Sequence, residues 1–60
     1  MKYYHYIDTA NNLEYVIRAN SRDAADRLAY WALEKPALNG EISDFEADRI
    51  GCPIIWLNQF

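Results

Sequence analysis

A chain of sixty residues with a single cysteine, Cys52, has to hold its fold together without an internal disulfide. It also carries a single histidine, His5, so we expect no zinc site built from cysteine and histidine. In a domain this small, apolar burial and lost conformational entropy nearly cancel. We therefore expect one domain over residues 1–60 that gains stability by burial against another chain, as in a homo-oligomer such as a dimer.

The charge balance narrows the class of partner. The formal net charge is −3, whereas nucleic-acid binders carry a basic face and anionic membranes attract basic segments. No apolar run approaches the length of a membrane span, and the tyrosine-rich start lacks the apolar segment of a signal peptide. One free thiol fits a reducing compartment. We expect a cytoplasmic protein that binds neither membranes nor, directly, nucleic acid.

Two runs with high β propensity open the chain. Residues Lys2–Asp8 and Leu13–Arg18 flank a short Asn-rich connector, which is typical of a β-hairpin. Strand alternation puts three apolar residues of the second run on one face, where we expect a helix to pack: Leu13, Tyr15 and Ile17. This interpretation places Tyr4 and Tyr6 of the first run and Val16 of the second run on the opposite, uncovered face of the sheet.

The main helix has a start signal, a periodic stripe and a stop signal. Asn20 and Ser21 can cap its first turn, and Pro36 predicts an end near Glu34. Apolar residues at helical spacing predict a buried stripe: Ala24, Ala25, Leu28, Trp31 and Ala32. Residues 37–40, which contain Asn39-Gly40, are typical of a turn.

A capping box then predicts a short second helix over Asp44–Ile50. Ser43 and Glu46 can satisfy each other's backbone amides, and Gly51 is a common helix stop. A strand from Glu41 to Glu46 is the alternative. The run Ile54–Leu57 is apolar on both faces and predicts either a central buried strand or an edge strand that pairs with another chain.

These elements predict the α+β class with the order ββααβ. We expect a small, three-stranded, mostly antiparallel sheet. One main helix packs on one of its faces, and the short second helix acts as a lid or connector. Such a fold carries no function with it, so function has to be argued from side chains.

Few residues suggest catalysis. A Cys52/His5 dyad needs both groups within hydrogen-bond reach, and nothing in their spacing places them together. Asp44 and Asp48 share a helical face, but a hard-metal site needs about six oxygen ligands and the chain has no dense acidic loop. We expect no enzyme activity, no cofactor and no metal.

The charge and aromatic patterns point to binding. The bases and acids of residues 1–35 balance, so the net charge lies in the segment from Glu41 to Arg49. Tyrosine and tryptophan are the residue types most enriched at interface hot spots. We therefore expect aromatic anchors and an acidic patch to contact a partner with a basic surface: Tyr4, Tyr6 and Trp56 as anchors, and Glu41, Asp44 and Asp48 as charges.

The favoured function is thus a non-catalytic protein-binding module, an inhibitor or an adaptor. Small acidic single domains of this type are common among phage-encoded (viral) proteins that block a host or defence protein. The first alternative is a structural homo-oligomer assembled through the C-terminal strand. The second is an acidic mimic of nucleic acid.

Overall fold

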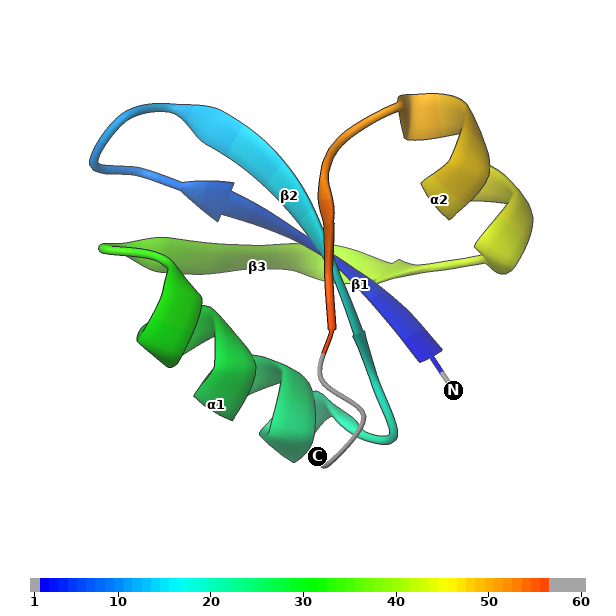
Figure 1. Ribbon diagram of the computed structural model, residues 1–60, viewed down its shortest axis with the longest axis horizontal. Coiled ribbons are helices and arrows are strands. Elements are labelled where there is room, and N and C mark those ends of the chain that lie inside the picture. The colour runs from blue at the N-terminus through cyan, green and yellow to red at the C-terminus, as the bar shows by residue number, and fades with distance from the viewer. Residues whose placement is uncertain (1, 57–60) are drawn as a thin grey trace.

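The computed structural model describes residues 2–56. Along the chain it contains β1 (Lys2–Asp8), β2 (Leu13–Ala19), α1 (Arg22–Ala32), β3 (Pro36–Ile42), α2 (Asp44–Ile50) and β4 (Ile54–Ile55). The strands form one sheet in the order β3-β1-β2-β4, and Figure 1 shows α1 and α2 on opposite sides of it. The α+β class is confirmed. The predicted three-stranded sheet and the ββααβ order are wrong, because a strand lies between the two helices and a short parallel strand ends the sheet.

The hairpin of β1 and β2 is confirmed, and its register corrects the assignment of the two faces. Tyr4 pairs with Ile17 and Tyr6 with Tyr15, and residues paired across two strands share a face. Tyr4 and Tyr6 therefore lie on the same face as Ile17, and this face packs against α1. The predicted opposite, uncovered face for these two tyrosines is wrong.

Helix α1 approaches this face through small residues. Ser21 caps it by accepting a hydrogen bond from the Ala24 amide, as predicted. Its buried residues are Ala25, Leu28 and Ala29, which pack with the two tyrosines in one core cluster. The predicted stripe is wrong in part. Trp31 is 73% exposed because it lies about 120° around the helix from Ala25. Ala32 shares the face of Ala25 but is the last residue of the helix, where it is exposed.

Asp8 joins the end of β1 to the segment that leads into β3. Its buried carboxylate accepts hydrogen bonds from the amides of Ala10, Glu34 and Lys35, each at 3.1 Å. Burial alone would raise the pKa of Asp8, but these three backbone donors outweigh it and hold the pKa below its usual value.

The segment predicted to be a turn, residues 37–40, is part of β3. It pairs antiparallel with β1, and a β-bulge interrupts the register between His5 and Tyr6. His5 pairs with Gly40 and Tyr6 with Leu38, so Asn39 is the extra residue of the bulge. Asn39 and Gly40 thus form a bulge within the strand. Gly40 has a φ of 152°, which residues with a side chain rarely adopt.

The second helix and the last strand agree with local signals. Ser43 accepts from the Glu46 amide at 3.1 Å, and Gly51 ends α2 in the left-handed conformation with φ 70°. This confirms the helix over the alternative strand. β4 is an edge strand that pairs parallel with β2, and Leu57 of the predicted run lies outside the described residues. Over residues 2–56, neither helix has the length and apolar character needed to cross a membrane.

Candidate functional site

The sheet face turned away from α1 is covered only in part, by α2 and by the loop that leads into β4 (Figure 1). Strand alternation places Tyr3, His5, Val16 and Arg18 on this face, and the register of β4 adds Ile54. We call it the α2 face. It carries two features: a polar cluster centred on His5 and a hollow beside α2.

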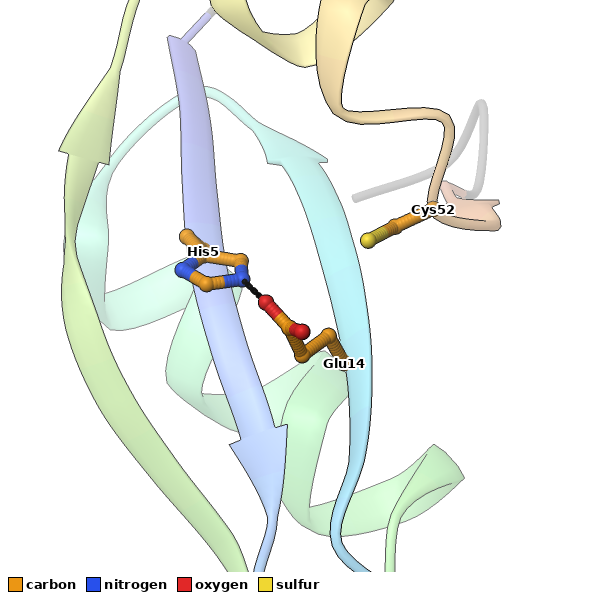
Figure 2. A group of neighbouring side chains, drawn as sticks. All are labelled: His5, Glu14 and Cys52. Carbon is orange, nitrogen blue, oxygen red and sulfur yellow. Dashed lines mark hydrogen bonds and ion pairs between the residues drawn. The ribbon is translucent and has the colours of Figure 1, made fainter.

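The polar cluster joins three segments that are distant in sequence. His5 comes from β1, Glu14 from β2, and Cys52 from the loop between α2 and β4 (Figure 2). The His5 Nε2 atom lies 2.8 Å from Glu14 Oε1, and the ligand atoms of all three side chains lie within 4.8 Å of one another. The fold thus brings His5 and Cys52 together, which nothing in their sequence spacing predicted.

Both nitrogens of the His5 ring have a partner. Glu14 offers only acceptors when ionised, so Nε2–H donates to its carboxylate. The Asn39 amide nitrogen lies 2.8 Å from Nδ1 and donates to it, which fits the tautomer with its proton on Nε2. His5 is also 93% buried, since only 7% of it is exposed. The ring is therefore fixed in place and orientation.

Cys52 faces this pair as a thiol. Its burial raises its pKa, and the negative charge of Glu14 raises it further. A nucleophilic cysteine needs the opposite, a lowered pKa and a base that is free to take its proton. Because both His5 nitrogens are engaged, the cluster lacks the arrangement of a Cys/His dyad.

The hollow lies between α2 and the sheet, beside this cluster. It has a volume of about 490 Å³ and is lined by Tyr3, Asp44, Phe45, Ala47, Asp48 and Ile54. Phe45 is 69% exposed and Ile54 is 44% exposed, so two large apolar side chains are open to solvent there. Asp44 and Asp48 add two carboxylates, and no ion pair within residues 2–56 involves either of them.

The structure separates the six predicted partner-binding residues. Asp44 and Asp48 come together in the hollow. Trp56 is 46% exposed, and the Arg18 guanidinium lies 5.5 Å from the centre of its ring. Glu41 pairs with Tyr4 across the sheet, so it belongs to the α1 side, where Lys2 lies 4.0 Å away.

The two predicted tyrosine anchors are core residues. Tyr4 is 4% exposed and Tyr6 is 2% exposed, and the Tyr6 hydroxyl donates to Asp26 of α1 at 2.5 Å. Burial and this hydrogen bond raise the pKa of Tyr6 well above its usual value. Neither side chain offers appreciable surface to a partner, so the prediction that they are surface anchors is corrected.

Sequence reasoning missed the apolar residues of the hollow and the partner of His5. Tyr3, Phe45 and Ile54 come from three elements, and only the placement of β4 beside β2 brings Ile54 to this face. The contact between Glu14 and His5 could have been predicted from the length of the hairpin connection. With four residues between the strands, Glu14 is the diagonal neighbour of His5 on the same face.

No protein-family model matches the chain, and neither the curated proteins nor the solved structures provide a significant match.

Proposed function

We propose that this protein is a non-catalytic binding module, an inhibitor or an adaptor, that docks a protein segment in the hollow beside α2. The observation that carries the proposal is the composition of that hollow. It sets exposed apolar surface from Phe45 and Ile54 beside the carboxylates of Asp44 and Asp48. A segment with an apolar anchor and flanking lysine or arginine residues complements both features.

The charge distribution supports a basic occupant. Asp44 and Asp48 are one helical turn apart, and no basic side chain within the described residues neutralises them at ion-pair distance. With a net charge of −3, the whole molecule favours the approach of a basic partner. We place this partner in the cytoplasm, where the free Cys52 stays reduced.

The residue types support docking over a purely solvent-exposed role. Aromatic side chains supply a large contact area at low conformational cost. Phe45 is such a side chain, and it is largely exposed on the capped helix α2. The Trp56–Arg18 pair, directly after β4, offers a second aromatic surface. In one form of this proposal, the chain is encoded by a phage and inhibits a host or defence protein by docking it in this way.

A capture experiment with matched variants tests the proposal. The immobilised protein is incubated with a bacterial lysate, in parallel with Phe45→Ala and with the double variant Asp44→Asn/Asp48→Asn. Trp31→Ala is the control, because Trp31 is an equally exposed aromatic on the α1 side. We expect a nuclease-resistant partner whose recovery falls at least about tenfold with both hollow variants. A tenfold loss of affinity corresponds to about 1.4 kcal/mol of binding free energy. A partner that is lost only in Trp31→Ala contradicts docking in the hollow.

Self-assembly is the alternative that one observation favours. β4 is an edge strand in the described sheet, and the free side of an edge strand can pair with a second chain. Light scattering distinguishes the two functions. A molar mass at a multiple of 7.0 kDa that Ile54→Lys reduces to the monomer value favours assembly through β4. The nucleic-acid mimic stays a prediction without a structural observation of its own.

A further inference from the structure

The polar cluster on the α2 face brings together three different metal-ligating groups in a chain that has one histidine and one cysteine. We propose that His5, Glu14 and Cys52 bind a divalent transition-metal ion of the zinc type. This site is separate from the hollow, and it stands or falls independently of the docking proposed above.

The donor set selects the class of metal. One imidazole nitrogen, one carboxylate oxygen and one thiolate sulfur suit Zn²⁺, which accepts all three donor types. Mg²⁺ and Ca²⁺ require oxygen ligands almost exclusively, so the sulfur and nitrogen exclude them. An iron–sulfur cluster requires several thiolates, whereas this chain has only Cys52.

The distances lie within reach of tetrahedral coordination. Zinc–ligand bonds of about 2.0–2.3 Å place neighbouring ligand atoms about 3.3–3.7 Å apart. The His5–Glu14 distance of 2.8 Å therefore has to open, and the Cys52 sulfur, within 4.8 Å of both, has to move slightly inward. The Glu14 side chain is 55% exposed and Cys52 lies in a loop, so both can make these small movements.

His5, by contrast, is held rigidly by its surroundings. It is 7% exposed, and the Asn39 amide contacts its second nitrogen at 2.8 Å. Metal-binding histidines nearly always have an outer partner that accepts from the second ring nitrogen and fixes the tautomer, a role that the side-chain oxygen of Asn39 can take once the amide turns. Asn39 reaches His5 because it is the extra residue of the β3 bulge, and bulges commonly redirect a side chain at functional sites.

The protons balance without any further reactant. In the metal-free form the His5 proton lies on Nε2, between the ring and Glu14. When the metal takes Nε2, this proton is released to solvent while Nδ1 takes up another. The Asn39 amide then turns by 180° so that its oxygen accepts from Nδ1–H. Cys52 releases its thiol proton to solvent, so binding releases one net proton. A water molecule completes the four positions of a tetrahedral ion.

Cobalt substitution provides the most specific test. Purified protein, freed of metal by a chelator, is titrated with Co²⁺ and then with Zn²⁺. We expect one Co²⁺ per chain, with a near-ultraviolet sulfur-to-cobalt charge-transfer band and the intense visible bands of tetrahedral geometry. Zn²⁺ should then displace Co²⁺ and abolish these bands. Failure to bind either ion at one equivalent overturns the proposal.

Variants assign the ligands. Cys52→Ser should remove the charge-transfer band and weaken binding at least tenfold, and Glu14→Gln should weaken binding to a similar extent. Asn39→Ala should weaken binding about 10- to 100-fold, as for other outer partners of metal-bound histidines. The double variant Asp44→Asn/Asp48→Asn is the control and should bind as the wild type does. Because Glu14 is exposed and Cys52 lies in a loop, these variants should stay folded by circular dichroism. Binding that survives both Cys52→Ser and Glu14→Gln overturns the site.

Discussion

The two faces of the sheet differ in how completely they are covered. On the α1 face, the helix buries Tyr4, Tyr6 and Ile17 in one apolar cluster. On the α2 face, the short helix α2 leaves Phe45 and Ile54 exposed. The same face carries the buried His5, which is hydrogen-bonded to the exposed Glu14. The α1 face therefore holds most of the apolar core, and we propose that the α2 face, with its hollow and polar cluster, is the binding face.

This division follows from the sizes of the two helices. α1 has 11 residues and presents small alanines that let its backbone approach the tyrosines closely. α2 has 7 residues and buries only Ala47, so it covers one end of its face. On this proposal, the core and the binding surface lie on opposite faces of one sheet, in a chain too small to build them in separate domains.

The largest expected effect is at the centre of the α1 face. Leu28 has no exposed surface and lies in the main cluster, so Leu28→Ala leaves a cavity that a small core cannot fill. We expect a loss of about 2–5 kcal/mol in the free energy of unfolding, measured by urea denaturation followed by circular dichroism. A loss below about 1 kcal/mol would show that α1 does not carry the stability.

The next effect concerns the junction at Asp8. Its pKa is lowered in the folded state, so its contribution to stability is full above the ordinary aspartate pKa of about 3.9 and is lost as the pH falls through the folded value. Asp8→Asn should be less stable than wild type at neutral pH, and its stability should fall less on acidification. Urea midpoints from pH 7 to pH 2 measure both, and parallel pH profiles for the two proteins would contradict this role.

A smaller effect is expected at the hydrogen bond between the sheet and α1. Tyr6→Phe keeps the buried ring and removes the hydroxyl that donates to Asp26. Because Asp26 is partly exposed and can bind water instead, we expect a loss of about 1 kcal/mol in the free energy of unfolding. A loss as large as that of Leu28→Ala would mean that this contact, and not apolar packing, dominates the α1 face.

The smallest effect is expected on the α2 face. Phe45 is 69% exposed, so Phe45→Ala should change the free energy of unfolding by no more than about 0.5 kcal/mol. Thermal denaturation of this variant beside wild type measures the change. A drop of several kcal/mol would show that Phe45 belongs to the core, and the contrast between the two faces would fail.

Local signals in the sequence were enough for the hairpin and both helices. Ser21, Ser43 and Gly51 each act as the cap or stop that their residue types predict. The face assignment failed because it depends on the hairpin register, where a shift of one residue moves every side chain of a strand to the other face. The four-residue connection, with Asn12 at a φ of 60°, sets that register.

Long-range pairing accounts for the other differences. Asn39-Gly40 has the chemistry of a turn, and only its pairing with β1 makes it a bulge. The approach of Cys52 to His5 depends on the path of the loop after α2, which no local pattern encodes. The acidic half of the hollow could be predicted from the spacing of Asp44 and Asp48, whereas its apolar half comes from three separate elements.

The central claim is that the α2 face is the binding face. Photo-crosslinking in bacterial cells tests it most directly, with a benzophenone amino acid placed at position 45 in one protein and at position 31 in another. These positions are similarly exposed and belong to opposite faces. We predict a discrete crosslinked protein from position 45 that is absent from position 31. Crosslinks from position 31 alone, or from neither position, would contradict the account.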